Sequence, residues 1–311
     1  MDSLFTFVEM DTLFSSYILP LVLAFIMFGM GATLTFDNFR YLFKYPKGLI
    51  TGLVGQMILL PLLAFLIAYL APINPLFKIG LVLVASCPGG ASSNLIVHLL
   101  KGNVAMSISF SAINSFLTLF SISFWMNLAL IMFSDESVPI EMDAWDTMEH
   151  IFLVVLLPAI LGMLFNKYYF TLARRLDRIM NIAMPVLLGL AMIGAVFIDK
   201  KADTPISLDL ILHIFPWVFL LNVVGLLGAY LLSRLFQLGN RNSTTISLEV
   251  GMQNTGLAIY IATSPAMLNS TDAAIPAAVY ALFTFFTAVA WGIFLRRKWV
   301  IRQIFPKKKS N

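Results

Sequence analysis

The sequence predicts an all-α polytopic membrane protein with nine transmembrane helices. Of its 311 residues, 59% are hydrophobic and only 12% are charged, whereas about 25% of the residues of a soluble domain are charged. Apolar runs of about 20 residues recur along the whole chain, and a helix needs this length to cross a bilayer. These runs lack the period-2 alternation of barrel strands. No domain-sized soluble segment remains, so residues 1–311 are expected to form a single membrane domain.

The predicted spans follow one another through mostly short loops. All but the third and the eighth are read as uninterrupted apolar helices. In chain order, the expected limits of the nine spans are 15–36, 48–71, 76–98, 104–133, 148–166, 179–198, 208–235, 244–265 and 274–296.

The basic residues predict an N-out, C-in orientation. Of the twenty Lys and Arg residues, all but Lys78, Lys200 and Lys201 fall on one side of the predicted membrane. An excess of basic residues marks the cytoplasmic side. The net charge of +4 is therefore an orientation signal and does not indicate a nucleic-acid partner. Because Cys87 is the single cysteine, no intrachain disulfide can form.

Two spans are interrupted near their middle. The third contains "CPGG" at 87–90, and the eighth contains Gly251 and Gly256. Proline removes a helix hydrogen bond and glycine weakens the helix that follows. Simple kinks would also give this pattern, but the two spans run in opposite directions and lie five spans apart. Matching breaks in two oppositely oriented halves indicate an inverted-repeat transporter, with spans two to four paired with spans seven to nine.

Glu249 is the only one of the sixteen acidic residues that this topology places well inside the bilayer. A buried carboxylate is costly there and needs a partner, yet no predicted span holds a Lys or Arg beside it. The partner is then a bound cation or a proton. Oxygen-bearing groups gather on the interrupted and neighbouring spans: Gln56, Ser92, Ser93, Asn94, Ser107, Ser111, Asn114, Gln253 and the backbone carbonyls at the second break. Hard cations prefer oxygen, and a single carboxylate favours a monovalent ion, so Na+ is the predicted ion.

The helix segments that begin after each break predict an anion site. Unpaired N–H groups and the positive end of a helix dipole are expected near 91–94 and 254–257, and these favour a carboxylate or sulfonate. A sodium-coupled organic-anion symporter is therefore the leading hypothesis. A proton-coupled carrier, in which Glu249 titrates, and a receptor that binds the anion without moving it are the alternatives. An enzyme is not expected, because the chain contains neither HExxH nor GxSxG.

These features together resemble the bile acid:sodium symporter family, including its bacterial members. The matching segments are "IMFGMGATLTFDNFRYLFKYPKG" (26–48), "CPGGASSNLIVHLLKGNVAMSISFSAIN" (87–114) and "LEVGMQNTGLA" (248–258). The resemblance implies two broken helices that cross, alternating access, and two domains: a core of residues 48–133 and 208–296, and a panel of residues 15–36, 148–166 and 179–198. It also implies two Na+ sites that share Glu249. The first would consist of Ser93, Asn94, Ser107, Ser111 and Glu249, and the second of Gln56, Glu249, Gln253 and the carbonyls of Val250 and Met252.

The substrate side is expected at the two breaks and on the last span. Asn254 matches a family ligand contact, and Thr255 follows it. Ala91 stands where some relatives have Thr, Ser92 is next to it, and Thr287 stands where some have His. Nearby phenylalanines favour a large amphipathic anion such as a bile salt. The expected partners are this anion, Na+ and the lipid bilayer, with no nucleic acid and no obligate protein partner. The expected location is the plasma membrane, the inner membrane of a bacterium.

Overall fold

The computed structural model describes residues 19–32, 35, 46–134, 144–173, 207–265 and 267–296. Over these residues the chain is all helical, which confirms the all-α part of the predicted fold class, and an isolated bridge between Gly89 and Gln253 is their only β pairing. The helices are α2 (Leu19–Gly31), α4 (Pro46–Val54), η2 (Gly55–Leu59), α5 (Leu60–Leu70), α6 (Pro75–Ser86), α7 (Ala91–Leu99), α8 (Val104–Phe133), α9 (Ala144–Ile151), η3 (Phe152–Leu156), α10 (Leu157–Tyr168), α12 (Leu208–Leu235), α13 (Asn240–Gly251), α14 (Thr255–Thr263) and α15 (Thr271–Leu295).

Each predicted span except 179–198, which lies outside the described residues, overlaps at least one of these helices. By length and composition, however, only four helices or continuous helix runs of the described part can cross a membrane alone, or five if the bent α8 counts as one span. The physical reason is that α6, α7, α13 and α14 have 12, 9, 12 and 9 residues. At 1.5 Å per residue, each falls short of a hydrocarbon core of about 30 Å. The count of nine spans and the orientation therefore stay predictions.

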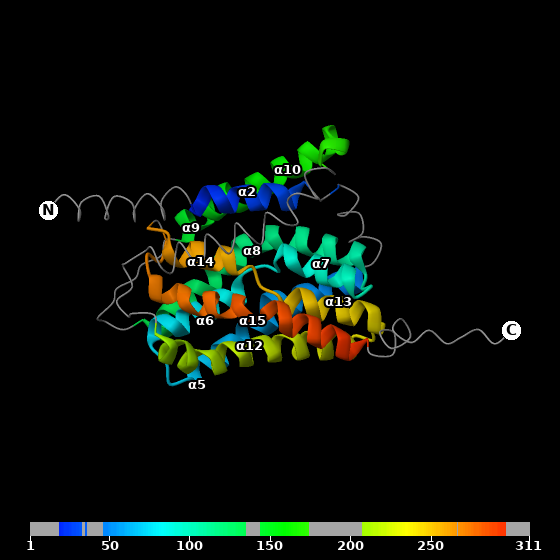
Figure 1. The fold of residues 1–311 in the computed structure, drawn as a ribbon. Coiled ribbons are helices and arrows are strands. Elements are labelled where there is room, and N and C mark those ends of the chain that lie inside the picture. The colour runs from blue at the N-terminus through cyan, green and yellow to red at the C-terminus, as the bar shows by residue number, and fades with distance from the viewer. Residues whose placement is uncertain are drawn as a thin grey trace, which may run out of the picture.

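The two interrupted spans approach one another at their breaks. In Figure 1, α6 and α14 lie toward one end of the molecule and α7 and α13 toward the other, and the two breaks lie near the centre. The Gly90 N–H donates to the Met252 carbonyl at 2.9 Å, and the Asn254 N–H donates to the Pro88 carbonyl at 2.8 Å. Backbone groups that each break leaves unpaired in its own helix are thus paired by the other break.

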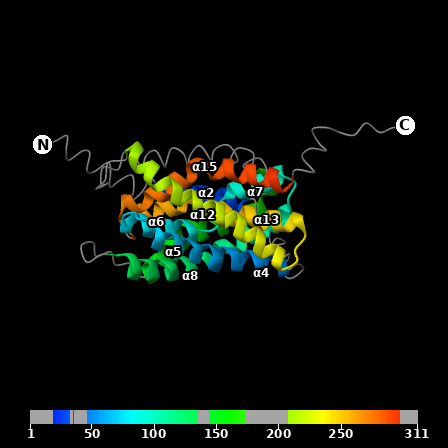
Figure 2. The ribbon, with the colours of Figure 1, turned by 90° about the horizontal axis from the view of Figure 1, so that it is seen from below.

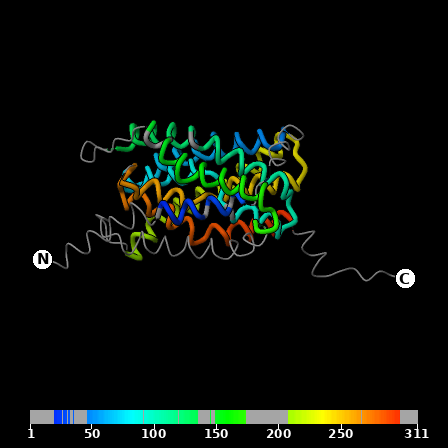
Figure 3. The backbone as a smooth tube through the Cα atoms, turned by 90° about the horizontal axis from the view of Figure 1, so that it is seen from above, coloured from blue at the N-terminus to red at the C-terminus, as the bar shows by residue number. Residues whose placement is uncertain are grey.

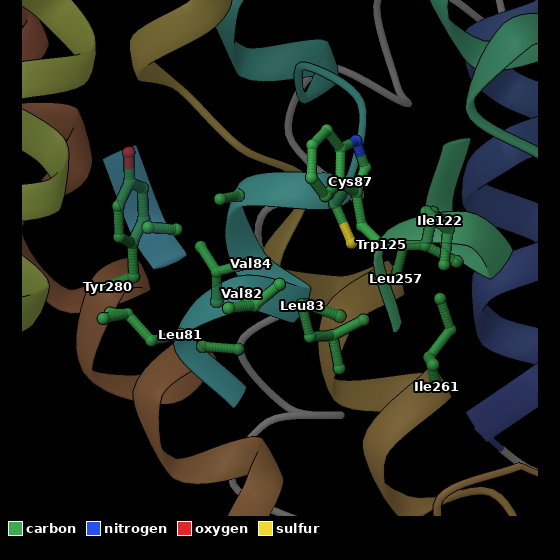
Figure 4. Packing of buried hydrophobic residues seen from close by; sticks show 14 of the residues in the cluster. Leu81, Val82, Leu83, Val84, Cys87, Ile122, Trp125, Leu257, Ile261 and Tyr280 are labelled. Atoms are coloured by element: carbon green, nitrogen blue, oxygen red, sulfur yellow. The ribbon is translucent and has the colours of Figure 1, made fainter. Parts of the chain in front are cut away.

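Helix α6 is the centre of the apolar core. Its residues from Ile79 to Ala85 are fully buried, as expected for a helix that is hydrophobic on all sides. Figure 4 shows its side chains among residues of three other helices: Ile122 and Trp125 of α8, Leu257 and Ile261 of α14, and Tyr280 of α15. Figure 2 shows α12 running obliquely across the face seen from below. The first break is therefore held by close packing on several sides.

Helix α13 begins earlier than the sequence predicts, at Asn240 instead of 244. Hydropathy misses this start because the segment "NRNSTT" is polar, yet Ser243, Thr244 and Thr245 are fully buried. Their hydroxyls are satisfied locally: Thr244 donates to the Asn240 carbonyl at 2.8 Å and Thr245 to the Arg241 carbonyl at 3.0 Å. The Thr245 hydroxyl also accepts from the N–H of Asn103 at 2.8 Å. Polar residues can enter a membrane interior when their own helix and a neighbour satisfy them.

Helices α2 and α10 pack against each other through two glycines. A Cβ atom at Gly31 would lie 2.0 Å from the Ala159 carbonyl oxygen, and one at Gly162 would lie 2.0 Å from that of Phe28. Such contact distances require the absence of a side chain, as at many membrane helix interfaces. Figure 3, viewed from above, shows these two helices in front of the rest of the bundle. This pair forms a separate layer in Figure 1.

We predict that Gly162→Ser lowers the thermal midpoint of the purified protein clearly, because the new side chain displaces α2 at a cost of about 1–3 kcal/mol. Gly239→Ser is the matched control. Gly239 has open space around it and precedes α13 as its N-cap, where serine is favoured. Equal midpoints for the two variants would contradict the close glycine packing.

Candidate cation and anion site

Glu249 lies in α13, and its side chain is fully buried. Two hydroxyls of α8 bind its carboxylate: Ser107 Oγ donates to Oε1, and Ser111 Oγ donates to Oε2 at 2.9 Å. Residues four apart on a helix face the same way, which is why α8 can present both hydroxyls to one carboxylate. Ser107 and Ser111 are 142 and 138 residues away from Glu249 in the sequence, so these contacts join distant segments.

Asn94 of α7 completes this group. The Ser107 hydroxyl lies 2.6 Å from Asn94 Oδ1 as well as next to Glu249 Oε1, and the Asn94 amide lies 3.4 Å from Ser111 Oγ. A hydroxyl carries one hydrogen, so it cannot donate fully to two acceptors at once. Three oxygen atoms, from Asn94, Ser107 and Glu249, are thus brought together with a single hydrogen among them. A cation fits such a group because it can be bound by all three oxygens.

The charge of Glu249 has only neutral partners in the described part of the chain, where no Lys, Arg or His reaches it. An uncompensated carboxylate in the bilayer interior costs at least about 2.5 kcal/mol, so a proton or a metal ion must accompany it. Among the same residues, no three His, Cys, Asp or Glu side chains form a cluster. The available ligands are oxygens, which suit a hard cation.

A second oxygen group lies beside the first, between the breaks. Gln56 is carried by η2, a π-helical turn, which is a common feature of functional sites. Its amide donates to the Cys87 carbonyl at 2.7 Å and to Gln253 Oε1 at 3.0 Å. The Gln253 amide lies 3.3 Å from Gln56 Oε1 and donates to the Val250 carbonyl. The two side-chain amides thus satisfy each other, and a cation at this place would have to replace a Gln56–Gln253 hydrogen bond.

The glycines of the first break permit this approach. A Cβ at Gly89 would lie 2.9 Å from the Glu249 carbonyl oxygen and 3.2 Å from its Oε2. One at Gly90 would lie 3.4 Å from the Gln253 carbonyl oxygen. The backbone of the first break therefore runs directly along Glu249, and a side chain at Gly89 would collide with the Glu249 backbone carbonyl and crowd its carboxylate.

The remaining predicted cation ligands are also near the breaks. Ser93 is fully buried, and its hydroxyl donates to the Gly90 carbonyl at 2.6 Å. The Val250 carbonyl accepts from Gln253, and the Met252 carbonyl accepts from the Gly90 N–H. A carbonyl oxygen can accept two hydrogen bonds, so each keeps a second lone pair for another partner.

The residues predicted to contact the anion differ in their burial and in their hydrogen bonds. Asn254 is the N-cap of α14, and its Oδ1 accepts from the Leu257 N–H at 3.0 Å. Thr255 is buried, and its N–H donates to the Gln253 carbonyl at 3.0 Å. Ser92 is exposed at the start of α7, next to Ala91, the first residue of that helix. The Thr287 hydroxyl donates to the Thr284 carbonyl of its own helix at 3.0 Å, and among the described residues it forms no hydrogen bond with either break.

A buried network around the end of α13 was not predicted from the sequence. The Asn222 amide lies 2.9 Å from both the Gly251 carbonyl oxygen and the Tyr280 hydroxyl, and the Tyr280 hydroxyl donates to the same carbonyl at 2.7 Å. Asn222 and Tyr280 are each fully buried. The signal in the sequence that could have indicated this network is Asn222, a single amide in the apolar run "FLLNVVGLL". Gln56 binds the Cys87 carbonyl at the first break as Asn222 binds that of Gly251 at the second.

Comparisons with known proteins show which family of transporters this chain resembles. The model of the family described as the Sodium Bile acid symporter family matches residues 20–203. The chain is 30% identical to the "Uncharacterized sodium-dependent transporter YocS" of Bacillus subtilis, over 90% of this chain and 83% of that protein. It is 32% identical to the "Probable sodium/metabolite cotransporter BASS1, chloroplastic" of Arabidopsis thaliana, over 76% of this chain and 57% of that one. It is 29% identical to the "Ileal sodium/bile acid cotransporter" of Homo sapiens, over 82% of this chain and 72% of that protein.

We predict that Tyr280→Phe lowers the thermal midpoint by an amount equivalent to about 1–3 kcal/mol. Two buried hydrogen bonds are lost, one from the Tyr280 hydroxyl to the Gly251 carbonyl and one from the Asn222 amide to that hydroxyl, and each is worth about 0.5–1.5 kcal/mol. Tyr230→Phe is the control, since the Tyr230 hydroxyl binds Asn240 at an exposed position. Thermal unfolding of both variants in the same detergent measures the difference. A Tyr280→Phe midpoint no lower than that of Tyr230→Phe would show that the network does not hold the end of α13.

Proposed function

Because the chain belongs to the sodium bile acid symporter family, we propose that it is a sodium-coupled secondary symporter of an organic anion. Members of this family are transporters and not enzymes, and the chain is a multi-pass protein of the plasma membrane. The observation that carries the proposal is the fully buried Glu249, whose carboxylate is surrounded by hydroxyl and amide groups of α7 and α8 where the two helix breaks meet.

Two Na+ ions are proposed on either side of the shared carboxylate. The first uses Asn94, Ser93, Ser107 and Ser111. Here the ion would be bound by the oxygens of Asn94, Ser107 and Glu249, which now share the single hydroxyl hydrogen of Ser107. The second uses Gln56, Gln253 and the carbonyls of Val250 and Met252, and it forms when the two glutamine side chains turn their oxygens toward the ion. Because the first group needs no such rearrangement, we expect it to bind Na+ first.

The organic anion is proposed to bind opposite the cations, at the N-termini of α7 and α14. Asn254 uses its oxygen to cap α14, which leaves its Nδ2 hydrogens as the donors for a carboxylate or sulfonate. The dipoles of both helices add positive potential at the same place. Ala91, Ser92 and Thr255 are the neighbouring contacts in this proposal. Thr287 of α15 is a further contact in this proposal.

Alternating access is proposed to occur by movement of the core, residues 48–133 and 208–296, against the panel, residues 15–36, 148–166 and 179–198. The inverted-repeat relation and the N-out, C-in orientation are part of this proposal. Two pairs of hydrogen bonds support the repeat. In the first pair, the Gly90 N–H donates to Met252 and the Asn254 N–H donates to Pro88, so the same bond runs in each direction between the two breaks. In the second pair, a side-chain amide donates to the carbonyl at the start of each break: Gln56 to Cys87 at the first and Asn222 to Gly251 at the second. The glycine contact between α2 and α10 supports a panel that holds together by itself.

Proton coupling is the second candidate, because a proton on Glu249 would also remove the buried charge. The set of neutral oxygens around Glu249 favours Na+, since a proton needs no further ligands. A receptor that binds the anion without moving it would use the same groups. Counterflow of labelled anion, in which internal unlabelled substrate accelerates uptake, separates that receptor from a carrier.

We predict that Glu249→Gln abolishes sodium-coupled uptake, because the amide keeps the shape of the side chain but removes the charge that holds both ions. The measurement uses proteoliposomes with labelled taurocholate, a steroid sulfonate, and labelled pantoate, a short polar carboxylate, under an inward Na+ or K+ gradient. The wild type accumulates at least one probe with Na+ alone, and the variant loses at least about tenfold, or 1.4 kcal/mol. Glu149→Gln, at an exposed carboxylate of α9, keeps the wild-type rate.

Uptake that is equal in Na+ and K+, or that survives Glu249→Gln at full rate, would contradict sodium coupling. Accumulation driven by a pH gradient in the absence of Na+ would establish the proton-coupled alternative instead.

We predict that Asn254→Asp separates the anion site from the cation site. Aspartate keeps the cap on α14, so the fold is retained, but it places a negative charge where the anion binds. Anion uptake should fall at least about tenfold, while stabilisation of the purified protein by Na+ stays at the wild-type level or increases. Asn254→Ser, which also caps the helix but adds no charge, is the control. Wild-type uptake by Asn254→Asp would exclude this end of α14 as the anion site.

A further inference from the structure

Asn114 of α8 is a buried polar residue that neither the proposed cation sites nor the anion site uses. Its side chain is fully buried, and in the described part of the structure neither its Oδ1 nor its Nδ2 has a hydrogen-bond partner. Leaving a buried polar group unpaired costs about 1–3 kcal/mol. An apolar residue of similar size would avoid this cost, so packing alone gives no reason for an amide here.

The position of Asn114 on α8 relates it to Glu249. Asn114 follows Ser111 by three residues and Ser107 by seven, so all three lie on one face of the helix. At 1.5 Å per residue, its Cα is about 4.5 Å farther along the axis than that of Ser111. Ser115 and Thr118, both buried, continue this polar face toward the C-terminal end of α8. The charge pattern predicts that this end faces the outside.

Ser109 provides a comparison on the same helix. Its hydroxyl is also fully buried and without a partner in the described part. It precedes Asn114 by five residues, which turns it about 140° around the helix axis. Ser109 therefore shares the burial of Asn114 but not the face that bears Ser107 and Ser111.

We propose that Asn114 Oδ1 is a ligand in a third cation position, which Na+ occupies in passing between the outer side and Glu249. The inference rests on the proposed sodium coupling. A cation is favoured over an anion because the carboxylate of Glu249 lies about one turn away, where it attracts positive charge and repels negative charge. The neighbouring groups on this face are hydroxyls, and they supply oxygen to an ion that is losing its water.

The consequence is a stepwise path for the ion along one face of α8. Thr118 and Ser115 come first from the outside, Asn114 next, and Ser111 and Ser107 with Glu249 last. An amide oxygen binds Na+ without a formal charge, so the ion can leave it for the carboxylate. Weak binding that permits departure is what conduction along a path requires.

The test measures Na+-dependent stabilisation of purified protein and the Na+ dependence of initial uptake into proteoliposomes, with choline replacing Na+. Asn114→Leu removes the unpaired amide, so its midpoint without Na+ should equal or exceed that of the wild type. It should nevertheless need at least about fivefold more Na+ for half-maximal initial uptake. Ser109→Ala should keep the wild-type Na+ requirement. Asn114→Asp, which adds a negative charge, should lower the requirement for half-maximal stabilisation at least about threefold.

A wild-type Na+ requirement in Asn114→Leu would overturn the proposal and make Asn114 a packing residue or a water ligand. If Asn114→Leu does not fold, Asn114→Asp decides in the same way, since an unchanged requirement overturns the third position. Failure of the sodium proposal itself looks different. In that case the wild type and Ser109→Ala are themselves stabilised equally by Na+ and K+.

Discussion

The contact between the Glu249 carboxylate and the hydroxyls of Ser107 and Ser111 is the interaction on which the rest of this structure depends. A carboxylate without a charged partner is unfavourable inside a bilayer, and hydroxyls alone reduce the cost without removing the charge. The site is thus complete only with a positive ion or a proton. The carboxylate is in α13, which precedes the second break, and its partners are in α8 and in α7, which follows the first break. Whatever neutralises Glu249 therefore also joins the segments next to the two breaks.

The breaks themselves make this arrangement accessible. Each ends a helix in the middle of the protein and leaves backbone groups unpaired, and each provides the other with part of the missing hydrogen bonding. Polar side chains donate hydrogen bonds to further backbone carbonyls at the breaks: Gln56 at the first, and Asn222 and Tyr280 at the second. Carbonyl oxygens and helix N-termini are consequently close together, so groups of the kind that can bind a cation lie beside groups of the kind that can bind an anion. In the proposed symport, this proximity couples the cation to the anion, since each neutralises the charge that opposes binding of the other.

The sequence predicts much of this because the relevant signals are local. A single acidic residue in a predicted span, a Pro-Gly-Gly break, and hydroxyls four residues apart can each be read from a short stretch. The pairing of Gln56 with Gln253, 197 residues away, and the Gly251 network depend on tertiary packing, which no short pattern encodes. The early start of α13 was missed because its buried hydroxyls are satisfied by the fold and not by water. The π-helical turn that carries Gln56 was missed because nothing in "GLVGQMILL" distinguishes it from an ordinary helix.

Hydrogen exchange at the two breaks tests most directly whether Na+ completes this site. Backbone amides of residues 89–94 and 252–257 would be followed by mass spectrometry in purified protein, first in K+ and then in Na+. If a cation on Glu249 joins the two breaks, Na+ slows exchange in both segments together, and the effect disappears in Glu249→Gln. Exchange that is the same in Na+ and K+, or that slows in only one of the two segments, would contradict the account.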